Sequence, residues 1–363
     1  MNTIPRDDLG ERPRKMLASG ELTVSVIVPV YNGGENFRRC LQSLKKTVPP
    51  PVEIIIVADG DTDGSWQLAK DFGLQVLRFP SPGGPARARN FGARKAQGEI
   101  LFFIDADVTI PPDAMSQVAM AFEREPHLAA VFGSYDDEPG EANFLSQYRN
   151  LMHHYVHQAG REEASTFWGA CGAIRREVFF AMGGFDERYG QPSKMVSGIE
   201  DIELGYRLKK ARYRIRLCKA LQVKHLKRWD LVSMVRTDIF VRALPWTELI
   251  LRDRRLVNDL NLRISQRLSM VLVYGILGTV VGAWWWPGSL AIAGLLIVLM
   301  LLINASLYRF FYQKRGFWFA VQTIPWHWLY FLYSGLAFVI GLFRYFLWKR
   351  RFSKTGSQQL KVE

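Results

Sequence analysis

The sequence contains few cysteines, and it begins without a hydrophobic segment. The three cysteines, Cys40, Cys171 and Cys218, are far apart and odd in number, so they predict neither a disulfide framework nor a zinc site. Residues 1–21 are polar and charged and lack the apolar core of a secretory signal. We therefore expect a reducing compartment, with the domain that follows residue 21 on the cytoplasmic side.

Signatures of several other protein classes are also missing. No Gly-x-Gly-x-x-Gly turn follows the first strand-like run, residues 22–32, which disfavours a dinucleotide-binding dehydrogenase. The lysine-containing glycine signature of a nucleotidyltransferase is absent from the same region. No basic module typical of nucleic-acid binding is present, so we expect no nucleic-acid partner.

Acidic residues are scarce in the last third of the chain. The formal net charge is +13, but the chain has 31 basic and 29 acidic residues up to Asp230 and 16 and 5 after it. Because the longest apolar runs lie in the same third, anionic lipid headgroups explain the basic excess better than nucleic acid does. We expect residues 231–267 to form an amphipathic surface on a membrane, and residues 349–363 to form a basic tail.

Charged residues are absent from two long stretches. Residues 268–308 are too long for one membrane helix, and the turn at 284–288 divides them; residues 316–343 form the second stretch, in which Pro325 precedes a further span. We predict membrane helices at about 268–286, 289–308 and 326–348. The uncharged turn should lie outside and the basic loop at 309–315 inside, in a multi-pass protein of the plasma (inner) membrane. The number of full crossings and the side of the C-terminus stay open.

Strand-like and helix-like patterns alternate in the first part of the chain. Apolar runs at residues 22–32, 52–57 and 75–79 alternate with helical periodicity at 35–46, 65–72 and 86–97. Such a pattern predicts an α/β fold with a mixed, mostly parallel, Rossmann-like sheet and helices on both faces. Ligands of these sheets bind beyond the carboxyl ends of the strands, where Asn32, Asp59 and Asp105 fall.

The strongest chemical signal is the apolar run at residues 98–108, which carries Asp105 and Asp107. If both lie on one strand, their side chains project to the same side. Two carboxylates on one side suit Mg²⁺ or Mn²⁺, whose other ligands are commonly substrate phosphate oxygens and water. The plain alternative is that they end a strand before a turn, with Asp113 capping the next helix.

A second polar group follows further along the chain. Glu200 and Asp201 open a predicted helix, where acidic residues also simply complement the helix dipole. Trp168 and the small residues 169–172 could form a platform for a substrate, or Trp168 could pack in the core. Arg87 and Arg89 could assist a leaving diphosphate, or could lie on a solvated helix face.

Six of these motifs, in this order, resemble family 2 glycosyltransferases: residues 24–32, the turn 59–64, Ala88-Arg89-Asn90, Gly98-Glu99, Asp105-Ala106-Asp107 and Glu200-Asp201. The resemblance covers residues 22–230. It implies a GT-A fold, a nucleotide-diphosphate sugar as donor, and inverting transfer dependent on Mn²⁺ or Mg²⁺.

The resemblance also implies roles for individual residues. Asp201, with Glu200 beside it, would be the catalytic base, and Asp59 would contact the nucleoside base. The implied donor-binding residues are Pro29, Tyr31, Asn32, Asp59, Arg87, Arg89, Asn90, Asp105, Ala106 and Asp107. The implied acceptor-binding residues are Trp168, Gly169, Arg228 and Trp229. The implied metal ligands are Asp107, Asp105 and His225, although His225 could equally be an ordinary interfacial histidine.

Two departures from the family pattern bear on the substrates. The second strand ends in Ala58-Asp59 instead of paired acids, which leaves the nucleotide open. Processive members carry Gln/Arg-x-x-Arg-Trp, of which only Arg228 and Trp229 are present here. We therefore expect single transfer to a lipid-linked or membrane-proximal acceptor, with membrane lipids as partners. A processive polysaccharide synthase and a non-catalytic membrane scaffold are the alternatives, and the sugar and the oligomeric state stay open.

Overall fold

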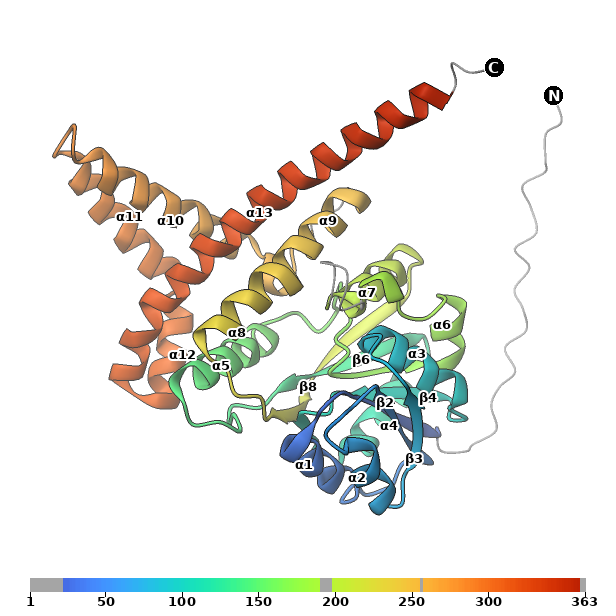
Figure 1. Cartoon of the computed structure of the whole chain (residues 1–363). Coiled ribbons are helices and arrows are strands. Elements are labelled where there is room, and N and C mark those ends of the chain that lie inside the picture. The colour runs from blue at the N-terminus through green and yellow to red at the C-terminus, as the bar shows by residue number, and fades with distance from the viewer. Residues whose placement is uncertain (1–21, 190–197, 255–256, 360–363) are drawn as a thin grey trace.

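The structure is a computed structural model that describes residues 22–189, 198–254 and 257–359. An eight-stranded mixed, mostly parallel sheet has the strand order β3-β2-β1-β4-β7-β6-β8-β5. It lies to one side of the C-terminal helices (Figure 1). The strands are β1 (Val24–Val30), β2 (Glu53–Asp59), β3 (Gln75–Phe79), β4 (Ile100–Ile104), β5 (Val108–Thr109), β6 (Leu128–Tyr135), β7 (Cys171–Arg175) and β8 (Arg214–His225). This arrangement confirms the predicted fold class.

Both faces of the sheet are covered because its central strands are apolar along their whole length. In β1, Val26 and Val28 pack into one core and Ile27 into the other, and β4 alternates in the same way. The helices on the first face are α1 (Gly34–Leu44), α2 (Ser65–Asp71) and α4 (Ala114–Arg124). Those on the second are α3 (Pro85–Lys95), α5 (Phe144–Gln158), α6 (Arg176–Ala181) and α7 (Glu200–Lys210).

Strand β7 is an element that the sequence patterns did not predict. It runs antiparallel between β4 and β6, with Ile104 opposite Cys171 and Phe132 opposite Gly172. Glycine and alanine weaken its strand signal, because both have low strand propensity. The strand nevertheless matters for function, since it brings Trp168 and Gly169 to the end of β4.

Three short helical segments connect the sheet to the apolar helices. Helix α8 (Leu231–Arg236), the π-helical turn η2 (Thr237–Ala243) and helix α9 (Leu244–Asp253) follow one another, and α9 packs along α13 (Figure 1). Trp229 and Tyr148 of the sheet domain share an apolar cluster with Leu307 and Phe311 of α12. The apolar helices are therefore packed directly against the sheet domain.

The C-terminal helices are α10 (Ile264–Gly282), α11 (Ser289–Ile303), α12 (Ala305–Arg315) and α13 (Phe317–Gln359). Two segments, Ile264–Gly282 and Phe317–Leu347, are long and apolar enough to cross a membrane. A third is possible if α11 and α12, which are bent by 61° at Asn304, form one span. Helix α13 continues through Pro325, where we expected a break. Proline removes one backbone hydrogen bond from the helix. In an apolar segment that loss costs less than ending the helix, because a break would leave several backbone groups without partners.

Candidate active site

A cavity of about 750 Å³ opens beyond the carboxyl ends of β1, β2 and β4. Its size is that of a typical small-molecule site. It collects most of the residues to which the sequence pointed: Pro29, Tyr31, Asn32, Asp59, Arg89, Asp105, Ala106, Asp107, Trp168, Glu200 and Asp201. The predicted site residues outside its lining are Arg87, Asn90, Gly169, His225, Arg228 and Trp229.

Asp59, at the end of β2, is almost fully engaged by its own surroundings. Its carboxylate accepts backbone N–H groups of Gly83 (2.9 Å) and Gly84 (2.7 Å) and the Arg87 guanidinium (2.8 Å). These contacts hold the loop before α3 against β2. Arg87 therefore does not line the cavity itself; it holds Asp59 and this loop in place at the cavity's edge.

Arg89 lies on α3 between two carboxylates of the cavity. Its guanidinium donates to Asp105 Oδ1 at 2.6 Å and to Glu200 Oε1 at 2.7 Å, and its side chain is 5% exposed. Burial opposes the positive charge, but Asp105 and Glu200 outweigh burial and raise the pKa of Arg89. Asp105 is thus paired with a fixed cation. On the same helix, Asn90 hydrogen-bonds the backbone of Phe185 and so lies in a structural role behind the cavity.

Asp105 and Asp107 do not share one face of a strand, contrary to the prediction from their spacing. Strand β4 ends at Ile104, and the chain turns through Ala106 so that β5 can pair with β8. That pairing puts Val108 opposite His225, and Leu226 N–H donates to the Asp107 carbonyl at 2.8 Å. The turn directs the two carboxylates to different partners, Arg89 and His225.

Asp107 and His225 form the pair best suited to a metal ion. Asp107 Oδ2 lies 3.4 Å from His225 Nε2, while His225 Nδ1 lies 2.8 Å from the Asn150 oxygen as assigned. With this assignment Nδ1 carries the proton, so the Nε2 lone pair faces Asp107. Tyr135 stacks on the His225 ring with centroids 4.6 Å apart and so fixes its orientation.

The donor types fit Mn²⁺ or Mg²⁺ bound by few protein ligands. Neighbouring ligands of an octahedral ion lie about 3 Å apart, close to the observed separation of Asp107 and His225. Across the described ranges, no group of three or more Cys, His, Asp or Glu side chains is arranged to hold a metal ion. Substrate oxygens and water would therefore supply the remaining ligands, as they commonly do for these ions.

Asp201 lies in the first turn of α7 and also lines the cavity. Its two oxygens accept the backbone N–H groups of Gly169 (2.9 Å) and Ile202 (2.8 Å). Burial raises the pKa of Asp201, and burial raises that of Glu200 to about 7 despite Arg89. A Cβ at Gly169 would lie 3.2 Å from the Arg89 guanidinium carbon, so a side chain there would press on the Arg89 ion pairs. Gly169 thus positions Asp201, although it does not line the cavity.

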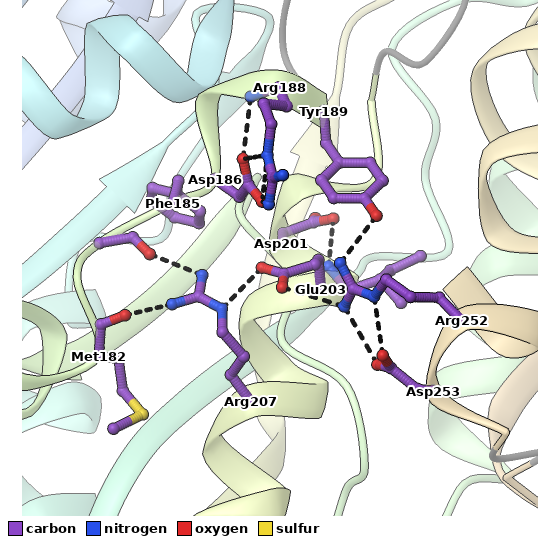
Figure 2. A network of polar contacts seen from close by, with 12 residues as sticks. Met182, Phe185, Asp186, Arg188, Tyr189, Asp201, Glu203, Arg207, Arg252 and Asp253 are labelled. Atoms are coloured by element: carbon purple, nitrogen blue, oxygen red, sulfur yellow. Dashed lines mark hydrogen bonds and ion pairs between the residues drawn. The ribbon is translucent and has the colours of Figure 1, made fainter. Parts of the chain in front are cut away.

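A polar network behind the cavity holds α7 in place. Figure 2 shows Glu203 between Arg207 and Arg252, with Tyr189 and Asp253 around Arg252. Glu203 is 2% exposed, accepts from Arg207 Nε at 2.8 Å, and contacts Arg252 of α9 at 3.4 Å. The helix with Asp201 is therefore tied to the helix that runs along α13.

The two residues predicted from the processive motif lie away from the cavity. Trp229 is buried in the cluster with Tyr148 and Phe311, and the Arg228 side chain is 71% exposed, facing Glu141. Sequence reasoning missed Lys227 and Arg242, which do line the cavity. Arg242 was counted with the membrane-facing basic residues, because helical periodicity alone does not show which side of a π-helical turn faces the sheet domain.

Comparisons with known proteins agree with this geometry. Residues 25–181 match the family model described as "Glycosyl transferase family 2". The glycosyltransferase GlyG of Streptococcus pneumoniae is 29% identical over 126 residues, which are 33% of this chain and 42% of GlyG. The uncharacterized glycosyltransferase YibD of Escherichia coli is 39% identical over 93 residues, 24% of this chain and 27% of YibD. The matched segments thus span less than half of either relative.

A solved structure resembles nearly the whole chain. It is the mannosyltransferase PcManGT from Pyrobaculum calidifontis in complex with GDP-Man and Mn²⁺, with a TM-score of 0.57, 19% identity and 88% of each chain covered. At this identity the likeness shows the fold, which is GT-A. The chain therefore contains a glycosyltransferase family 2 domain of the GT-A fold, followed by long apolar helices.

Proposed function

We propose that the protein is a membrane-bound inverting glycosyltransferase, which moves a sugar from a nucleotide-diphosphate donor to a lipid-linked or membrane-proximal acceptor at the cytoplasmic face. The observation that carries this proposal is that Asp107, which faces His225, lines the same cavity as Asp201. The complex of PcManGT with GDP-Man and Mn²⁺ supports a donor and a metal of the same kinds here.

The proposed reaction assigns a separate task to each side of the cavity. Asp201 takes the proton of an acceptor hydroxyl, whose oxygen attacks the anomeric carbon of the sugar from the face opposite the diphosphate. The new carbon–oxygen bond forms as the bond to the diphosphate breaks, and its electron pair leaves with the diphosphate oxygen. One inversion results, because no protein group bonds to the sugar.

Asp107 and His225 are proposed to hold Mn²⁺ or Mg²⁺, with Asp105 fixed near them by Arg89. The bound ion would neutralise charge on the departing diphosphate. Pro29, Tyr31 and Asn32 after β1 would contact the nucleotide, together with the loop that Asp59 holds. Trp168, packed edge-on against Tyr135 with centroids 4.9 Å apart, would face the acceptor.

The proposed location at a membrane rests on the C-terminal half of the chain. The segments Ile264–Gly282 and Phe317–Leu347 are candidates for crossing it, and the basic excess after Asp230 suits an anionic surface. Single transfer is favoured over polymer synthesis because Trp229, which the processive motif places at the acceptor, packs in an apolar cluster away from the cavity.

A donor screen followed by a transfer assay tests the proposal. The full chain, purified in detergent, would be heated with each of a set of nucleotide sugars, with and without Mn²⁺. A donor that raises the melting temperature only with Mn²⁺ would then be labelled in its sugar and incubated with total membrane lipid. We expect label in the organic phase. Label found only in a long water-soluble polymer would contradict single transfer, and no stabilisation by any donor would contradict the assignment as a glycosyltransferase.

A further inference from the structure

Arg242 is a cation of the cavity for which the described residues provide no direct partner. It lies in η2, lines the cavity and is half-buried. Burial and the nearby Arg149 lower its pKa. Within residues 22–189, 198–254 and 257–359, its guanidinium forms no hydrogen bond or ion pair. A half-buried guanidinium that the protein leaves unpaired is suited to an anion from outside.

The neighbouring Arg149, in contrast to Arg242, is paired with an acidic side chain. Both of its terminal nitrogens donate to Asp238, one of them at 2.7 Å, and Tyr333 of α13 also donates to Asp238 at 2.6 Å. Arg149 is thus paired directly with Asp238, whereas in the described residues Asp238 forms no hydrogen bond or ion pair with Arg242. Of these two neighbouring arginines, the described residues therefore pair Arg149 and leave Arg242 without a direct partner.

Lys227 is a second cation on the same wall of the cavity. It is half-buried, and its Nζ lies 4.2 Å from the centroid of the Trp229 ring. Burial lowers its pKa, although Asp107 acts in the opposite direction. In the described part of the chain, Lys227 forms no ion pair with a carboxylate. Lys227 lines the same cavity as Asp107 and Arg242, and both of them act on its pKa.

Asp238 and Asp201 act to raise the pKa of Arg242 without forming an ion pair with it, and the remaining groups near it are neutral or apolar. Burial lowers the pKa of His153 and lowers that of His157 to about 3, so both rings are uncharged at neutral pH. Val241, Trp246 and Leu260 line the cavity on this side. Exposed Val232 and Phe240 lie on the same segment, α8 to η2. An anionic group with an attached hydrocarbon chain would match this surface.

We propose that Arg242, assisted by Lys227, binds a phosphate group carried by the acceptor, and that the acceptor is a phosphate-bearing lipid. This inference rests on the proposed function, and it names the class of acceptor. The phosphate is recognised by the two cations, while a hydroxyl of the same lipid faces Asp201 and attacks the sugar. Arg242 is then a specificity-determining residue at the acceptor end of the cavity.

The test measures binding separately from turnover. Farnesyl phosphate is the probe, farnesol is its match without the phosphate, and inorganic phosphate is its match without the chain. Each would be titrated by calorimetry into the detergent-purified full chain and into Arg242→Gln, Arg242→Lys and Arg236→Gln. Arg236 is an exposed arginine of α8 outside the cavity, and therefore the matched control.

We expect farnesyl phosphate to bind the unchanged protein more tightly than either farnesol or inorganic phosphate. Its Kd should rise about tenfold or more in Arg242→Gln, recover in part in Arg242→Lys, and stay unchanged in Arg236→Gln. Equal affinity for inorganic phosphate would contradict a lipid ligand. If Arg242→Gln does not fold, the same loss is expected in Lys227→Gln, and normal binding by that variant would contradict the shared site.

A further arm separates the two phosphate sources within the enzyme. UDP and GDP, each with Mn²⁺, would be titrated into the same variants. If Arg242→Gln binds the nucleotides more weakly but binds farnesyl phosphate normally, Arg242 contacts the donor instead of the acceptor. That result would overturn the inference. If farnesyl phosphate behaves as expected but no nucleotide sugar is turned over, the phosphate site stands and the glycosyltransferase proposal fails.

Discussion

The four aspartates around the cavity have different partners, so substitutions of them should have different effects. Asp59 holds a loop, Asp105 pairs with Arg89, and Asp107 faces His225. Asp201, among the residues that the structure describes, accepts backbone N–H groups alone. A loop anchor mainly affects binding of the nucleotide, while a metal ligand affects metal dependence. A base affects turnover alone. All four residues are aspartates, so it is their local contacts that distinguish their roles.

Asp107→Asn should remove metal-dependent activity and leave the protein folded. The Asp107 side chain is 33% exposed, so the fold does not depend on its charge, while Mn²⁺ would lose its only anionic protein ligand that is not already paired with arginine. We expect the affinity for Mn²⁺ in the presence of donor to fall by about 100-fold. Asp113→Asn, an exposed aspartate beyond β5, is the control. Normal Mn²⁺-dependent donor binding by Asp107→Asn would remove Asp107 from the metal site.

Asp201→Asn should lower kcat by about 10²-fold or more, with nearly unchanged donor affinity. The reason is that a general base acts on the acceptor hydroxyl, while the amide can still accept one of the two backbone N–H groups. Steady-state kinetics with the donor found in the screen, together with donor titration, would measure both quantities. A large loss of donor binding would assign Asp201 a role at the donor instead.

At the scale of elements, α7 is held by a buried carboxylate between two arginines. Glu203→Gln should lower the free energy of unfolding by about 2 kcal/mol, because Arg207 and Arg252 lose their shared counter-charge. Thermal melting in detergent would show this as a decrease of several degrees. Donor affinity should change little, since Glu203 does not line the cavity.

The matched control for this variant is Glu163→Gln. Glu163 contacts Lys209, also on α7, at 2.8 Å, but its side chain is 66% exposed. Exposed ion pairs contribute less than about 1 kcal/mol. Equal destabilisation by the two variants would mean that the Glu203 contacts do not anchor α7.

At the scale of the whole molecule, the helical segments decide on which side of a membrane the cavity lies. The turn between α10 and α11 is uncharged and exposes Trp285, whereas the end of α12 carries Lys314 and Arg315. If these helices cross a membrane, the positive-inside tendency predicts that the turn lies outside and the sheet domain in the cytoplasm.

Labelling of single cysteines with a membrane-impermeant maleimide would test this orientation. The background is Cys218→Ser, because Cys40 and Cys171 are buried. We expect Trp285→Cys to react in intact spheroplasts, and Gln313→Cys on α12 to react only after permeabilisation. The opposite pattern would place the sheet domain outside the cell.

The sequence by itself determined the class of fold and the family resemblance. Strand runs are continuous and apolar, helices repeat at 3.6 residues, and the motif residues lie next to these elements in the chain, so local spacing carries the signal. For the same reason the absence of charge over residues 268–308 was enough to predict apolar membrane helices, although not the 61° bend at Asn304.

Only the tertiary structure decided which side chains meet. Asp107 meets His225 because β5 pairs with β8, which is more than a hundred residues away in the chain. Arg89 reaches both Asp105 and Glu200 because α3 and α7 lie on the same face of the sheet. Arg242 turns to the cavity while Trp229 turns to α12, in the reverse of the sequence-based expectation. Such contacts depend on strand pairing and helix packing between distant segments, and no local pattern of residues records them.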